Sequence, residues 1–135
     1  MRTFACITLF LVLSVFGFGQ TAKDQQTIAQ MSIDLEALQK YLRAHQTEEH
    51  NALYICDNGA IPTNLNLNKF GAPVKFLDKN ALFFHVIEAY LYFEKFQVSE
   101  KEAQVAFQFA VEELKIELTF EKVGGVWKVV TGDME

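Results

Sequence analysis

The stretch AQVAFQFAVEELKIELTFEKVGGVWKVV, residues 103–130, has the clearest pattern in the chain. Apolar and polar residues alternate over Ala103–Phe109 and again over Leu114–Glu121, which is typical of β-strands with one buried face. Gly124-Gly125 then leads into a further strand candidate, Val126–Thr131. Two glycines suit a tight hairpin, because both can adopt positive φ. The stretch therefore predicts three consecutive antiparallel strands.

The residues before this stretch predict a fourth and longer strand, His85–Val98. The connection Ser99–Glu102 is short, so the two strands that it joins must be antiparallel neighbours. Within the long strand, the apolar residues change from odd to even positions at Glu94-Lys95. One extra residue produces such a change, so we expect a β-bulge there.

The first part of the chain predicts a helix. Five apolar residues recur at helical spacings of three and four: Ile28, Met31, Leu35, Leu38 and Leu42. They mark one stripe of a helix from about Asp24 to His45, with Asp24 as its N-cap. We expect this stripe to pack on the sheet.

Shorter elements are expected between the helix and the long strand. Leu53–Cys56 reads as a strand that ends at the turn Asp57-Asn58-Gly59, and a second strand is marked by Val74 and Phe76. Asp78 can cap a brief helix over Lys79–Phe84. Leu82 and Phe83 would be its inward-facing residues.

The segment Gly59–Ala72 has no sustained pattern and contains several asparagines. It is either a ragged edge strand or an irregular loop. Irregular segments of this length are uncommon in compact domains unless they bind something or move, so a binding role is one hypothesis for it.

These elements give an α+β fold: an N-terminal helix packed on a curved, mainly antiparallel sheet that ends in a four-strand meander. The order resembles the NTF2-like and cystatin-like superfamily, and the resemblance is carried by Tyr92–Phe96, Ala103–Phe107 and the closing Phe120–Val130. It implies a sheet that wraps a helix, with a pocket at its open end that can also be filled. The superfamily contains isomerases, dehydratases and non-catalytic binders, so the fold alone fixes no function.

Composition narrows the class of protein. The chain has 135 residues, of which 50% are hydrophobic, and a formal net charge of −5 from 17 acidic and 12 basic residues. The length suits one domain, and the acidic balance argues against a nucleic-acid partner. The apolar content is too high for a disordered tail.

The beginning of the chain reads as a secretory signal. Arg2 precedes an apolar run, and Gly17-Phe18-Gly19 supplies the small residues of a cleavage site. We therefore expect residues 1–19 to be removed, leaving a domain of residues 20–135 that is periplasmic or secreted and has no stable membrane anchor. The alternative is an uncleaved N-terminal anchor. Cys56 would be the one cysteine left, so no internal disulfide is expected.

A metal or cofactor site is not expected. His45 and His50 are five residues apart, which places them on diverging sides of a helix, whereas zinc helices use ligands at i and i+4. No Gly-rich phosphate loop, nucleophile elbow or Cys-His pairing of recognisable spacing is present, so no cofactor and no catalytic residue is assigned.

The resemblance suggests where a ligand could bind. A pocket enzyme of that superfamily would need a carboxylate base and a hydrogen-bond donor inside its cavity. Asp57 and Glu88 are the candidate bases. The candidate donors are Tyr54, Tyr90, Tyr92 and His85. From these groups, the candidate ligand-binding residues are Tyr54, Asp57, His85 and Glu88.

Tyr90 and Tyr92 also suggest a surface for a protein partner. If Leu91 and Phe93 face the core, the two tyrosines face the other side of the strand. There they would suit a flat partner surface or a homodimer contact.

The leading hypothesis is an exported, non-catalytic binding or scaffold domain, whose partner is a small molecule or a protein. The alternatives are a pocket enzyme that uses acid–base chemistry, of isomerase or dehydratase type, and an interaction subunit that uses the tyrosine-bearing face.

Overall fold

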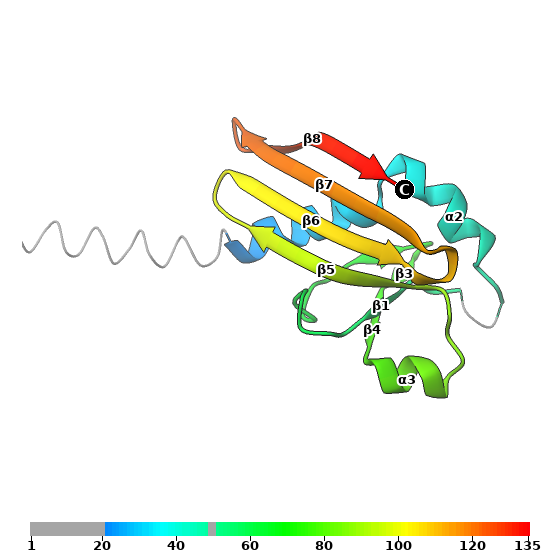
Figure 1. The fold of residues 1–135 in the computed structure, drawn as a ribbon. Helices are drawn as coiled ribbons and strands as arrows, with labels where there is room; N and C mark the ends of the chain where they lie inside the picture. The colour runs from blue at the N-terminus through cyan, green and yellow to red at the C-terminus, as the bar shows by residue number, and fades with distance from the viewer. Residues whose placement is uncertain (1–20, 49–50) are drawn as a thin grey trace, which may run out of the picture.

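A computed structural model describes residues 21–48 and 51–135 and shows an α+β architecture (Figure 1). Its main sheet has six strands in the order β4-β1-β5-β6-β7-β8. These strands are β1 (Tyr54–Cys56), β4 (Lys75–Leu77), β5 (Tyr90–Val98), β6 (Glu102–Phe109), β7 (Leu114–Val123) and β8 (Val126–Met134). β1 is parallel to both of its neighbours, whereas β5 to β8 form an antiparallel meander. The sheet is therefore mixed but mainly antiparallel.

The predicted meander is confirmed. Gly124 and Gly125, with φ of 59° and 79°, make the turn between β7 and β8. The predicted bulge is also present, because Phe93 pairs with Phe107 whereas Lys95 pairs with Ala106, which leaves Glu94 as the extra residue.

The core lies on one face of the meander, under the N-terminal helical segments (Figure 1). Phe93, Phe107, Phe109 and Phe120 are fully buried there, and the rings of Phe93 and Phe107 stack with centroids 4.8 Å apart. The opposite face of the meander is mostly polar, in agreement with the alternation in the sequence.

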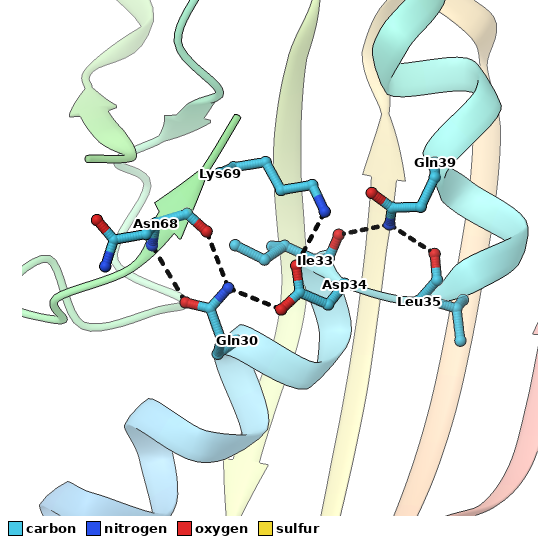
Figure 2. A network of polar contacts seen from close by, with 7 residues as sticks. All are labelled: Gln30, Ile33, Asp34, Leu35, Gln39, Asn68 and Lys69. Atoms are coloured by element: carbon cyan, nitrogen blue, oxygen red, sulfur yellow. Dashed lines mark hydrogen bonds and ion pairs between the residues drawn. The ribbon is translucent and has the colours of Figure 1, made fainter. Parts of the chain in front are cut away.

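The predicted single helix is wrong in its middle. Residues 21–33 are helical, and two short helices follow after a break. These are η1 (Glu36–Leu38) and α2 (Gln39–Ala44). Leu35 leaves the helical region at the break, with φ −52° and ψ 124°. Figure 2 shows how the break is stabilised: the Gln39 side-chain amide donates to the carbonyl groups of Ile33 and Leu35, at 3.0 and 2.7 Å.

Asp24 is not an N-cap, because the helix already includes residues 21–23. Its carboxylate is buried and accepts hydrogen bonds from Trp127 Nε1 at 3.0 Å and Lys122 Nζ at 3.1 Å. Asp24 therefore joins the first helix to the C-terminal hairpin, 103 residues further along the chain. Trp127 is buried, whereas Val129, two residues further along β8, is 41% exposed.

The segment after β4 contains helix α3 (Lys79–Phe84). Asp78 caps it as predicted, because its Oδ1 accepts a hydrogen bond from the Ala81 amide at 2.7 Å. Leu82 is buried as expected, but Phe83 is 87% exposed, so its inward placement is wrong.

The long strand does not begin at His85. Val86 takes a left-handed conformation with φ 56°, and its amide donates to the Phe83 carbonyl at 3.1 Å. The Ile87 amide donates to the Leu82 carbonyl at 2.9 Å. These bonds form a Schellman motif that ends α3, so the chain becomes extended only at Tyr90.

The segment Gly59–Ala72 is largely irregular. It includes β2 (Asn68–Lys69), which pairs outside the main sheet with β3 (Ala72–Pro73). The Gln30 side chain donates to the Asn68 carbonyl at 2.9 Å and accepts from the Asn68 amide at 3.1 Å (Figure 2). Gln26, one turn earlier, makes the same pair of bonds to Asn66. Two side-chain amides thus fasten this segment to the first helix as a neighbouring strand would.

Candidate functional site

A cleft of about 260 Å³ lies between the end of α2, the start of β1 and the Schellman segment, residues 86–89. Most of its wall is apolar and comes from segments far apart in the sequence. The apolar side chains include Leu42, Leu53, Phe70, Ile87, Phe109 and Val111. Small-molecule sites in proteins are concave and mostly apolar in this way, with a few polar groups that orient the ligand.

The polar groups of the cleft are His45, Gln46, Thr47, Tyr54 and Glu88. They come from the C-terminal end of α2, from β1 and from the segment after α3. Gln46 also bridges to the Asn51 carbonyl through its Nε2, at 3.2 Å.

Among the residues that the structure describes, His45 is the one imidazole that lines the cleft. Its Nε2 lies 2.7 Å from Glu112 Oε1 on η2 (Ala110–Glu112), and its ring packs edge-on against Phe109, with centroids 5.5 Å apart. An ionised carboxylate only accepts hydrogen bonds, so in the neutral ring Nε2 carries the proton. Nδ1 is then the unprotonated nitrogen, which can accept a proton from a ligand. The pair is partly exposed, with side-chain accessibilities of 30% and 37%, so it orients the ring more than it stabilises the fold.

Two of the four predicted ligand-binding residues lie at this cleft. Tyr54 is buried in β1, between Lys75 and Tyr90 on the neighbouring strands, and Glu88 is exposed on the segment before β5. Both line the cleft. The structure therefore brings together a tyrosine and a carboxylate that are 34 residues apart in the sequence.

The other two predicted ligand-binding residues lie elsewhere. Asp57 follows β1 with its side chain exposed, and its backbone amide donates to the Leu77 carbonyl at 2.8 Å. His85 is the exposed C-cap of α3, and its ring lies edge-on to Phe84 with centroids 5.2 Å apart. Neither residue lines the cleft.

The two predicted partner-binding tyrosines differ from each other. Leu91 and Phe93 face the core as predicted, so Tyr90 and Tyr92 lie on the other side of β5. Tyr92 is 37% exposed beside Gln108. Tyr90 packs against the cluster that α3 forms with β1, so the two rings do not form one open surface.

Cys56 belongs to that cluster. Its thiol is buried beside Leu82 and Ile87, and this burial raises its pKa, which the nearby Lys79 partly opposes. A thiol with a raised pKa is a weak nucleophile at neutral pH, so Cys56 acts as a packing residue.

Large side chains pack on the sheet face that the N-terminal helix covers. Phe107 and Phe109 are buried there, whereas Phe76 is half-buried and Phe83 is exposed. The candidate cleft therefore lies at the side of the core.

His45 and Glu112 were missed as site residues in the sequence. They are 67 residues apart, and no short motif joins them. From the sequence, His45 was considered only as a metal ligand together with His50, and a metal site was not expected. His50 lies outside the described residues. Within residues 21–48 and 51–135, no three histidine, cysteine, aspartate or glutamate side chains gather closely enough to hold a metal ion.

Neither helix hydropathy nor similarity to known proteins assigns a function to the cleft. In the part of the chain that the structure describes, no helix combines the length and hydropathy needed to cross a bilayer. No model of a known protein family, no characterised protein and no solved structure matches the chain. The resemblance to the NTF2-like and cystatin-like superfamily therefore stays a prediction.

Proposed function

We propose that this protein is a small-molecule-binding domain whose ligand occupies the cleft lined by Leu42, His45, Tyr54 and Ile87. The observation that carries the proposal is the composition of the cleft. Its walls are apolar, and its few polar groups converge from three separate segments. That combination favours a ligand with an apolar body and one polar group.

The size of the cleft limits the ligand. An apolar cavity of about 150 Å³ accommodates a benzene ring. The volume here is about 260 Å³, which suits a ligand of one or two rings. The carboxylate of Glu88 at its edge favours an amine or hydroxyl as the polar group.

Binding of 1-naphthylamine, a two-ring amine with environment-sensitive fluorescence, tests this proposal. Ala52 lines the cleft and is half-buried, so Ala52→Phe fills part of the space. We expect that variant to bind the probe at least tenfold more weakly than the unmodified protein.

The matched control is Ala106→Phe, which adds the same side chain to the polar face of β6, away from the cleft. Its affinity for the probe should equal that of the unmodified protein. Equal binding by Ala52→Phe, or no binding by any of the three proteins, would contradict the proposal.

One observation favours a second function, acid–base catalysis on the bound ligand. His45 is held by Glu112 through Nε2, which leaves Nδ1 to take up a proton from a carbon acid. Deuterium incorporation into cyclohexanone in D₂O, followed by NMR, tests this function. His45→Gln should remove any acceleration and Glu112→Gln should reduce it, whereas equal rates for the unmodified protein and His45→Gln would exclude it.

We also propose a superfamily and a cellular compartment for the protein. Assignment to the NTF2-like and cystatin-like superfamily is supported by the helix on a mainly antiparallel sheet and by the four-strand meander. Export with removal of residues 1–19 is supported by the sequence of that segment alone, which lies outside the described residues. The N-terminal sequence of the protein recovered from its own host tests export: it should begin at Gln20.

A further inference from the structure

Strand β8 forms one edge of the main sheet in the part of the chain that the structure describes, and Figure 1 shows it as the outermost strand of the meander. One side of its backbone pairs with β7. Among the described residues, no backbone hydrogen bond joins its other side to another element. The strand has nine residues, most of them exposed, and no proline. An edge of this length can pair with a further strand.

Two sets of contacts show which way the backbone groups of β8 point. Lys115 and Glu135 exchange both of their backbone hydrogen bonds, at 2.8 and 2.9 Å, whereas the Lys122 amide donates to the Lys101 carbonyl at 2.8 Å. Bonding directions alternate along an antiparallel ladder, so the odd-numbered residues of β7 bond to β8. The residues of β8 that pair with even-numbered residues of β7 therefore direct their amides and carbonyls away from β7. These residues, which we call the outer set, are Trp127, Val129, Gly132 and Met134.

A bulge in β8 gives the outer set an irregular spacing. Thr119 pairs with Thr131 and Phe120 pairs with Val129, which leaves Val130 as the extra residue. The members of the outer set are therefore two, three and two residues apart, a spacing that is the same in both directions. A second β8 running the opposite way matches it at every position. A regular strand carries such groups at every second residue, so it meets the interval of three with an interval of two.

Antiparallel pairing of β8 with β8 of a second copy, about a two-fold axis at the bulge, satisfies the whole outer set. Trp127 then lies opposite Met134 of the second copy, and Val129 lies opposite Gly132 of the second copy. Each of these pairs exchanges two backbone hydrogen bonds. The side chains are compatible as well, because Val129 is 41% exposed and Gly132 has no side chain to obstruct it.

The same register pairs charges of opposite sign, because Lys128 falls opposite Asp133 of the second copy. Within one chain, Asp133 pairs with Glu117 on β7, and like charges directly opposite each other are unfavourable. Neither Lys128 nor Asp133 belongs to an ion pair among the described residues. The second copy thus brings a cation to Asp133 and Glu117. Because the register follows from the backbone alone, this charge pairing supports it independently.

We infer that β8 is a self-association edge, on which a second copy of this chain adds its own β8 so that the two sheets become one continuous sheet. The same residues of both copies form the contact, as two-fold symmetry requires. The backbone bonds of the outer set hold the two strands together, and the two Lys128–Asp133 pairs favour this register. The inference is independent of the proposed ligand, because oligomeric state is measured without one.

Sedimentation velocity over a concentration series tests the inference with two variants of Val129. Val129→Pro removes an amide that points away from β7, so the pairing within the chain keeps its bonds. Val129→Thr, the matched control, keeps both the amide and a β-branched side chain. The unmodified protein and Val129→Thr should dimerise with increasing concentration, whereas Val129→Pro should dimerise at least about tenfold more weakly.

Hydrogen exchange of the unmodified protein tests the contact without any substitution. The amides of the outer set should exchange more slowly as the protein concentration rises. The amides of Lys128 and Asp133 bond to β7 in the monomer already, so their exchange should change far less. Equal slowing of both groups of amides would contradict pairing through the outer set.

Charge exchange tests the register. Lys128→Asp and Asp133→Lys should each weaken dimerisation, and the double variant should restore it, because two-fold symmetry regenerates both pairs. Failure of the double variant to dimerise would overturn this register. A strictly monomeric unmodified protein would overturn the inference as a whole, as would equal dimerisation of Val129→Pro and Val129→Thr.

Discussion

The meander of β5 to β8 and the segment of residues 51–89 are stabilised in different ways. In β6 and β7 of the meander, local alternation and tertiary packing agree, so every inward side chain of these two strands is buried. In residues 51–89, short elements are held by caps and side-chain hydrogen bonds, and apolar groups such as Phe83 remain exposed. The cleft and the exposed side chains of Phe83 and Phe84 both belong in part to this second region. The regular part of the sequence therefore builds the scaffold, and the irregular part contributes most of the candidate site.

Truncating one phenylalanine in each region should give the largest contrast. Phe107 is 1% exposed and stacks on Phe93, so Phe107→Ala should lower the free energy of unfolding by about 3–5 kcal/mol. Phe83→Ala, at an exposed position, should change it by less than about 0.5 kcal/mol. Urea denaturation of dilute protein measures both. Similar losses for the two variants would remove the distinction between the regions.

Asp24 should show how strongly the first helix depends on the C-terminal hairpin. Asp24→Ala leaves Lys122 and the indole N–H of Trp127 without the acceptor that they share, which should cost about 2–3 kcal/mol. Asp24→Asn keeps an acceptor for the indole and should lose less. The same denaturation measurement applies, and an unchanged midpoint for Asp24→Ala would show that this buried contact does not hold the helix.

Gln30 should matter mainly for the irregular segment. Gln30→Ala removes both bonds to the Asn68 backbone, so we expect a loss of about 1–2 kcal/mol and faster hydrogen exchange at the Asn68 amide. Gln97→Ala, an exposed change on β5, is the control and should leave that amide unchanged. If exchange at Asn68 is the same in both variants, the segment is held by other contacts.

Cys56 should give the smallest effect, a loss of stability in alkaline solution. Burial raises the pKa of its thiol in the folded protein, so the unfolded chain ionises first as the pH rises. The free energy of unfolding should therefore fall, by less than about 1 kcal/mol between about pH 8 and about pH 9.5. Cys56→Ala should show a shallower decline over this range, and identical slopes would contradict the pKa direction.

Much of the scaffold could be predicted because its signals are local. Three local signals specify the strands, the bulge and the turn without reference to distant residues. They are the period of two over residues 114–121, the parity change at Glu94-Lys95 and the Gly124-Gly125 pair. The helix break could not be found in this way. Leu35 continues the apolar spacing, and the chain bends there in an arrangement that Gln39 stabilises through the carbonyl of Ile33.

The candidate site was predicted only in part. Tyr54 and Glu88 were named from their residue types, and the structure places both at the cleft. His45 and Glu112 meet only through tertiary packing, so no spacing rule connects them. The long strand was predicted to start too early. The residue at the C′ position of α3 is a valine, whereas a glycine there would have indicated in the sequence that the helix ends.

The most direct test of the central claim is a ¹H–¹⁵N NMR titration of the protein with 1-naphthylamine. If the cleft is the ligand site, the largest shifts will fall on residues 42–47, 52–54, 86–89 and 109–111, and the amides of residues 116–134 will stay in place. Shifts that are largest in residues 116–134, or no shifts at saturating probe, would contradict the claim that the cleft binds a small molecule.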